Sequence, residues 1–398
     1  MAPALPWRLL AWGALGVCLH VGLARFGYGV VLPSLREELG LGYTAGGGLN
    51  AVHLGGYLAG TLTGAGLVGK RGVPRLGMAG LARLGHWLVV AGAVACALAP
   101  AEASAGPWVM GVGRLATGLG AGWAVIGILV TVLGGVAETA RAQASVLIWT
   151  GTAATILGCG LAVPWLLVPG QWRWVFAAAG AVAFVLAVGF PGGGERPAPG
   201  AGEPGAGEPG FTLAAVATPR WAWLVATYFC FGLGYIAYAT FAGARLAAAG
   251  AAVAVVSMTW TMVGVATLAG SLLTLLVLAR PRLRPMALPG AMAAGAAGAM
   301  MAALPGAVAA VLGAVLVGLG MAAIPALITA AARTRSSAGD YARAFSVATA
   351  VMGLGQLLGP VLAGGLADAL GPIAAPLFGA VAYAAGAGMA VVDLRRVR

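Results

Sequence analysis

The sequence predicts an all-α membrane protein with twelve transmembrane helices in two pseudo-symmetric six-helix bundles, and three observations support this fold class. The chain of 398 residues is 61% hydrophobic and only 8% charged, with a mean hydropathy of +0.97. Soluble domains have about a quarter of their residues charged. Twelve apolar runs are separated by short polar segments, and each has about the length that a helix needs to cross a hydrocarbon layer. The two halves of the chain also repeat each other.

The apolar runs divide evenly around a central break. The break is rich in Gly and Pro and repeats the unit GAGEPG, a composition typical of a flexible linker. We therefore predict an N-terminal bundle at 1–190, a flexible cytoplasmic linker at 191–215 and a C-terminal bundle at 216–398. The twelve predicted helices lie near 7–32, 43–69, 76–99, 107–134, 143–168, 172–190, 219–243, 253–279, 286–304, 307–331, 344–369 and 373–392.

The internal repeat is visible in two alignments of the halves. A shift of 210 residues aligns Gly22-Leu-x-Arg25-x-x-Tyr28 with Gly232-Leu-x-Tyr235-x-x-Tyr238. Farther along, a shift of 202 residues aligns an acid-x-x-Arg loop at 138–141 with another at 340–343. Parallel repeats of six helices are typical of transporters whose substrate site lies between the repeats near the middle of the membrane.

The basic residues indicate the orientation. Sixteen Lys and Arg residues lie in the loops and ends on the side that holds both termini, and three lie on the other side. By the positive-inside rule, both termini are cytoplasmic in a multi-pass protein of the cell (inner or plasma) membrane. The net charge of +12 is thereby explained by loops facing the cytoplasm, so we expect a lipid bilayer and no nucleic acid as partner, and a monomer.

Two arginines inside apolar runs are the main candidates for function. Arg25 and Arg114 lie at similar depths in the first and fourth runs. A charged group there costs about 2.5 kcal/mol or more and by default marks a functional site. All ten carboxylates fall in loops or at the ends of runs, so we expect a positive interior that suits a carboxylate or phosphate group. Two alternatives remain: Arg25 could reach the near interface, and Arg114 could bond backbone carbonyls of neighbouring helices.

Six further polar residues are expected to complete a substrate site. Asn50 and His53 share one helix face with Tyr57 through their spacing. The alternative for His53 is a satisfied packing histidine, and the alternative for Tyr235 and Tyr238 is aromatic packing. Packing is the interpretation preferred for His20 and His86. The six candidates are Tyr28, Asn50, His53, Tyr235, Tyr238 and Gln356.

No cofactor, metal site or enzyme activity is predicted. The four cysteines lie inside apolar runs with no metal-like spacing, which is typical of small packing residues. The run Gly64-Ala-Gly66-Leu-Val-Gly69 fits a dinucleotide fingerprint, but it ends a membrane helix and follows no strand. The buried regions offer no nucleophile–base pair.

Two motifs resemble a known family. The run Arg25-Phe-Gly-Tyr28…Pro33-Ser-Leu-Arg36-Glu-Glu-Leu resembles the YbfB/YjiJ-type branch of the major facilitator superfamily. The fourth run contains Arg114-Leu-Ala-Thr117-Gly118-Leu-Gly120-Ala-Gly122, similar to the helix-four signature of that superfamily. The resemblance covers essentially the whole chain and implies the superfamily fold and secondary transport by alternating access.

The sequence thus predicts a secondary active transporter of a small organic anion, in particular a carboxylate. One alternative is a proton-coupled efflux pump for amphipathic or drug-like compounds. A remote alternative is a membrane-embedded receptor or enzyme.

Overall fold

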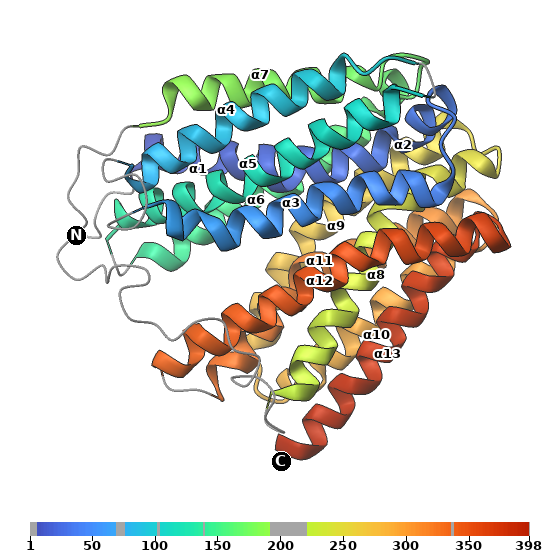
Figure 1. Cartoon of the computed structure of the whole chain (residues 1–398). Helices are drawn as coiled ribbons and strands as arrows, with labels where there is room; N and C mark the ends of the chain where they lie inside the picture. Colours follow the sequence, from blue (N-terminus) through green and yellow to red (C-terminus); the bar gives the residue numbers. More distant parts are fainter. Residues whose placement is uncertain are drawn as a thin grey trace. The chain divides into compact units, whose positions relative to one another are not determined.

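The computed structural model describes residues 6–68, 76–101, 104–137, 140–191, 221–335 and 338–397, which form helices with no strand among them. Three segments form one continuous helical stretch: α1 (Trp7–Val17), η1 (Cys18–Gly27) and α2 (Tyr28–Glu38). The all-α prediction is confirmed, and each predicted run matches a helix or this stretch (Figure 1). The others are α3 (Tyr43–Leu67), α4 (Met78–Ala97), α5 (Gly106–Gly134), α6 (Arg141–Leu166), α7 (Arg173–Gly189), α8 (Ala222–Ala248), α9 (Val253–Leu278), α10 (Arg284–Ala303), α11 (Ala307–Arg333), α12 (Ala338–Leu370) and α13 (Ala374–Val397).

Most of these helices are long and apolar enough to span a membrane. Within the described residues, ten helical stretches meet both conditions, the first being the 32-residue stretch Trp7–Glu38. The two remaining helices are less apolar or shorter. The sequence of α3 includes Asn50, His53 and several glycines and threonines, while α7 has 17 residues.

The first stretch contains a π-helix that nothing in the sequence indicates. The ten residues of η1 form i→i+5 turns between two α-helices. Such wide turns are rare and occur frequently at functional sites. The stretch then continues through Pro33 to Glu38, six residues beyond the predicted end, because membrane helices tolerate an internal proline. The π-helix therefore sets which way Arg25, in its last turn, faces.

The contacts divide the chain into two compact units, each described by itself. Unit 1 comprises 1–40, 52–156 and 168–208, and unit 2 comprises 41–51, 157–167 and 209–398. The predicted linker 191–215 lies outside the described residues except for Pro191. The predicted domain boundaries therefore stay a prediction.

Unit 1 is held together by close packing of α4 on α5 and of α4 on α7. Glycines allow the first of these contacts: a Cβ atom at Gly113 would lie 2.7 Å from the carbonyl oxygen of Gly92. Small residues of this kind let membrane helices approach closely, where dispersion contacts stabilise the pair. The consequence is that the residue after Gly113, which is Arg114, is held inside the bundle.

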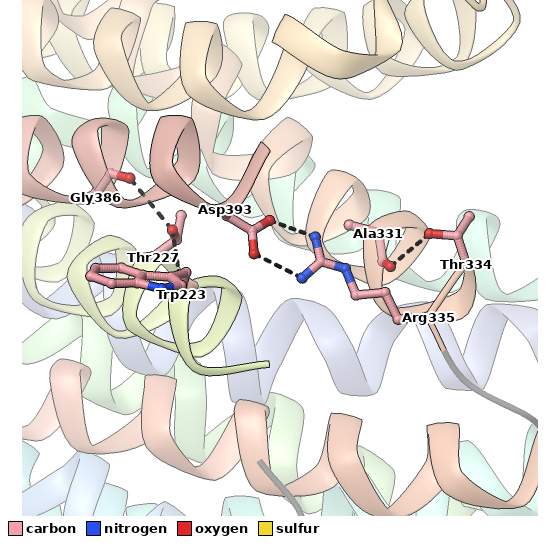
Figure 2. Close-up of polar contacts among 7 residues, drawn as sticks. All are labelled: Trp223, Thr227, Ala331, Thr334, Arg335, Gly386 and Asp393. Atoms are coloured by element: carbon pink, nitrogen blue, oxygen red, sulfur yellow. Dashed lines mark hydrogen bonds and ion pairs between the residues drawn. The ribbon is translucent and has the colours of Figure 1, made fainter. Parts of the chain in front are cut away.

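In unit 2, α8 packs against α12 and α13, and α9 packs against α11. One end of this unit contains a buried ion pair, drawn in Figure 2. Two nitrogens of Arg335, just after α11, donate to the two carboxylate oxygens of Asp393 in α13 at 2.8 and 2.5 Å. Beside it, the Thr227 hydroxyl donates to the Trp223 carbonyl one turn earlier in α8 at 2.8 Å. The ion pair ties the last helix to the residues after α11, and a longer bond from the same Thr227 hydroxyl to the Gly386 carbonyl, at 3.5 Å, ties it to α8.

Candidate functional site

Arg25 lies inside unit 1 rather than at its rim. Its side chain is 7% exposed, and its guanidinium carbon lies 4.3 Å from the centre of the Tyr57 ring. This burial does not fit the alternative in which Arg25 reaches the membrane interface. A guanidinium over an aromatic face gains electrostatic attraction, which increases when water is excluded. Tyr57 was placed on the helix face of Asn50 and His53 by its spacing but was not among the predicted site residues.

Arg114 is buried more deeply and contacts the same helical stretch. It is 1% exposed, and its guanidinium carbon lies 4.4 Å from the centre of the Tyr28 ring. One of its terminal nitrogens donates to the carbonyl oxygen of Ala24 at 2.7 Å. This bond agrees with the alternative in which Arg114 binds backbone carbonyls. It also fixes the guanidinium beside the residue that precedes Arg25.

His53 is connected to Arg114 through a threonine. His53 is fully buried, and its Nδ1 lies 3.2 Å from the Thr117 hydroxyl. That hydroxyl donates to the Arg114 carbonyl at 3.0 Å, so its oxygen accepts from His53, and Nδ1 carries the proton. The Nε2 atom is then a proton acceptor, and it has no hydrogen-bond partner among the described residues. Thr117 was quoted in the helix-four motif, but no role was predicted for it.

Unit 1 thus brings together four of the eight predicted residues, Arg25, Tyr28, His53 and Arg114. Two guanidiniums, two tyrosine rings and an imidazole come from η1, α2, α3 and α5. The arrangement concentrates positive charge and hydrogen-bond donors within an apolar bundle, where electrostatic interactions are stronger than in water.

In unit 2, the structure joins two other predicted residues directly. The amide nitrogen of Gln356 in α12 donates to the Tyr235 hydroxyl in α8 at 2.7 Å, and both side chains are buried. The Tyr235 ring stacks on Phe231 with centroids 4.7 Å apart. The pair is a neutral hydrogen-bonding group beside an aromatic cluster.

The last two predicted residues make separate contacts in unit 2. The Asn50 amide donates to the Thr240 hydroxyl at 2.8 Å, and that hydroxyl donates to the Ile236 carbonyl at 2.7 Å. Tyr238 is 1% exposed, and its hydroxyl has no hydrogen-bond partner among the described residues. The Tyr238 hydroxyl is therefore the group of these two residues that could still bind a ligand.

Metal-binding clusters are not found among the described residues, where no three His, Cys, Asp or Glu side chains gather. The four cysteines, Cys18, Cys96, Cys159 and Cys230, are thiols without disulfides.

Comparisons with known proteins give one family and several similar structures. The model of the family described as "Uncharacterised MFS-type transporter YbfB" matches residues 17–392. Comparison with curated protein sequences finds no match. A structure of a bacterial homolog of the human lysosomal transporter Spinster, inward-facing and unoccupied, is similar with 18% identity and a TM-score of 0.71, covering 98% of this chain and 96% of that one.

Two further structures are similar at the same level. For a mutant of the nucleoside transporter NupG, the identity is 14% and the TM-score 0.73, with 98% of each chain covered. For a D-xylose–proton symporter, the identity is 16% and the TM-score 0.70, with 98% of this chain and 97% of that one covered. At these identities the similarity shows the shared fold alone.

Proposed function

Since the chain belongs to the family of YbfB-type transporters of the major facilitator superfamily, we propose that the solute it moves is a small organic anion, in particular a carboxylate. Membership establishes a multi-span membrane protein that carries out secondary transport by alternating access, rather than an enzyme. The anionic character of the substrate is the part that we propose.

The observation that supports an anion is the pair of guanidiniums buried in unit 1. Arg25 and Arg114 are 7% and 1% exposed, and each has a tyrosine ring against one face. Stacking fixes the plane of a guanidinium, and a fixed fork of N–H donors matches the two oxygens of a carboxylate. Because these charges lie in an apolar bundle, their attraction for an anion is screened less than it would be at the surface.

The remaining candidates would supply neutral polar contacts. In this proposal Tyr28 orients Arg114, and His53 offers its Nε2 atom as an acceptor for a hydroxyl or protonated group of the solute. Asn50, Tyr235, Tyr238 and Gln356 belong to unit 2, and their part in substrate binding stays a prediction. Hydroxyl and amide groups of this kind give specificity without adding charge.

The proposal is tested by comparing ligand classes on purified protein. Thermal unfolding is measured with a panel of carboxylates and phosphates, their neutral analogues and organic cations. A ligand at 100 times its Kd stabilises the folded state by about 2.7 kcal/mol. We expect stabilisation by members of the anionic set only, and uptake of the stabilising anion in proteoliposomes.

Variants then identify the groups that bind. Arg25→Gln and Arg114→Gln should each weaken anion binding by about tenfold or more, because a charge-assisted bond of roughly 1.5–3 kcal/mol is lost. Arg245→Gln is the matched control: Arg245 is also buried, at 9% exposed, but donates to the carbonyls of Ala303 and Leu304 in unit 2. Normal anion binding by both Gln variants would refute the proposal.

A second candidate is a proton-coupled efflux pump for amphipathic or drug-like compounds. The observation in its favour is an aromatic cluster in unit 2, in which Phe231 contacts Tyr228, Tyr235 and Tyr383 with centroids 4.7 to 6.2 Å apart. Aromatic walls suit flat apolar ligands. Expression in a drug-sensitised host separates the two functions, because only the pump would raise the inhibitory concentrations of amphipathic compounds.

We further propose a monomer in the inner or plasma membrane with both termini cytoplasmic, on the basis of the basic loops. Reporter fusions at each terminus test the orientation, and a periplasmic signal from either would contradict it. Mass photometry of nanodisc-embedded protein tests the oligomeric state.

A further inference from the structure

Two histidines lie against each other in the core of unit 1, although 66 positions separate them in the sequence. His20 in η1 and His86 in α4 are both fully buried, with ring centroids 5.1 Å apart and planes inclined by 14°. Phe190 meets the His86 ring edge-on at 5.8 Å. Leu19 and Val21, on either side of His20, belong to the apolar core of this unit. The pair is therefore surrounded by apolar side chains.

The ring nitrogens of this pair are not satisfied by the protein. Within the described residues, neither Nδ1 nor Nε2 of His20 or of His86 has a hydrogen-bond partner. A neutral imidazole has one donor and one acceptor, so four buried polar groups lack partners. Buried polar groups are normally paired, and exceptions require a reason. Phenylalanine or leucine would pack here without that cost, so packing does not account for two imidazoles.

The ionisable side chains on the surrounding helices are nearly all bases or neutral groups. As described, α1, η1, α3, α4, α5, α6 and α7 contain no aspartate or glutamate. Electrostatic interactions link His53 with Arg25, Arg114 and His20, and link His20 with His86. The charged and titratable groups on these helices, apart from cysteines and the pair itself, are Arg8, Arg25, Tyr43, His53, Tyr57, Arg83, Arg114, Arg141 and Arg173. The next segment along the chain, α2, adds Tyr28, Arg36, Glu37 and Glu38 at its two ends.

We propose that His20 and His86 form a binding site for one proton, and that this proton binds when an anion occupies the site at Arg25 and Arg114. This inference rests on the proposed function. The proton joins the lone pair of one imidazole nitrogen and makes an imidazolium. The second ring stays neutral, because two stacked cations would repel each other at this distance. When the anion leaves, the proton leaves with it.

The coupling follows from charge. In the empty protein, protonation would add a further positive charge to a core that already holds two guanidiniums, and burial opposes it as well. A bound anion supplies the negative charge that the surrounding helices lack. By linkage, the anion must favour the proton as much as the proton favours the anion. The chain would therefore move the two together, in the same direction.

The chain contains only three histidines, which makes a direct test feasible. Protein labelled with 15N-histidine in nanodiscs gives three sets of ring-nitrogen signals, which His20→Gln and His86→Gln assign. The pH of half-protonation is then measured between pH 4 and 8. Arg25→Gln removes one of the positive charges that interact with His53, which in turn interacts with His20, and Arg25→Glu replaces it with a negative one, as a bound anion would. Arg173→Gln, at the first residue of α7, is the control.

We expect both rings of the pair to be neutral in the wild type at pH 7. In Arg25→Gln the half-protonation pH should rise, and in Arg25→Glu it should rise further, because the first variant removes a positive charge and the second also adds a negative one. Only one ring of the pair should become charged, and Arg173→Gln should match the wild type. If Arg25→Glu does not fold, the Arg25→Gln shift decides.

Two results would overturn the proton site: signals of the pair that do not move in either Arg25 variant, or both rings becoming charged together. These outcomes are independent of the thermal-shift screen. If anions stabilise the protein while the pair stays neutral in every variant, anion transport stands and the proton site fails. If the pair takes a proton in Arg25→Glu but no anion stabilises the wild type, the proton site stands and the proposed substrate fails.

Discussion

The ion pair between Arg335 and Asp393 gives a sharp test of what holds unit 2 together. The two side chains are 7% and 8% exposed and form two parallel hydrogen bonds of 2.8 and 2.5 Å (Figure 2). Asp393→Asn keeps the shape of the side chain and removes its charge, which leaves a buried guanidinium without its counter-ion. Breaking a buried pair from one side costs about 3–5 kcal/mol.

The cost converts to a measurable shift in melting temperature. For a unit of this size, each kcal/mol lowers the Tm by about 2–4 °C, so Asp393→Asn should melt on the order of 10 °C below the wild type. The assay is intrinsic fluorescence during heating of detergent-purified protein at a fixed scan rate. Arg333→Gln, an exposed arginine at the end of α11, is the control and should stay within about 0.5 kcal/mol.

A double variant separates the charge from the packing. Arg335→Met with Asp393→Leu should recover most of the lost stability, because apolar residues of similar volume replace buried ion pairs at little cost. A Tm loss below about 2 °C for Asp393→Asn would refute the reasoning. So would a double variant that is no more stable than the single one, since the coupling energy would then be near zero.

Three further predictions follow from single contacts. Gly22→Ala should destabilise unit 1 by about 1–3 kcal/mol, because its Cβ would lie 2.5 Å from the Cβ of Thr155. In thermal unfolding, the double variant Gly22→Ala with Thr155→Gly should recover part of that stability. A double variant that loses as much stability as Gly22→Ala alone would contradict the clash. Asp368→Ala should speed hydrogen exchange at the start of α3 about fivefold, since its carboxylate accepts two backbone N–H bonds there at 2.7 Å and a helix cap contributes about 1 kcal/mol. Unchanged exchange would exclude the cap. Tyr57→Leu should weaken anion binding more than Tyr57→Phe, because only phenylalanine keeps a ring under Arg25. Similar affinities of the two variants in the thermal-shift assay would show that stacking is not needed.

The sequence predicted the fold class and helix positions well because membrane helices are set by local composition. Runs of apolar residues must cover about 30 Å of hydrocarbon and satisfy their own backbone hydrogen bonds. The first stretch is the exception in detail: neither its π-helix nor its continuation past Pro33 to Glu38 has a signal in composition. In η1, Gly22 packs against Thr155 of α6, a contact between segments far apart in the sequence.

The candidate site residues likewise have some properties that follow from local composition and others that follow from packing between helices. The sequence by itself placed Arg25 and Arg114 inside candidate membrane spans, because their positions along the apolar runs predict their depth. Only the tertiary structure decided that each stacks on a tyrosine, that Arg114 binds the Ala24 carbonyl, and that His20 faces His86. Depth is a property of one helix and can be counted along the chain. Contact depends on the rotation of two helices about their axes, which is set by packing between segments far apart in the sequence.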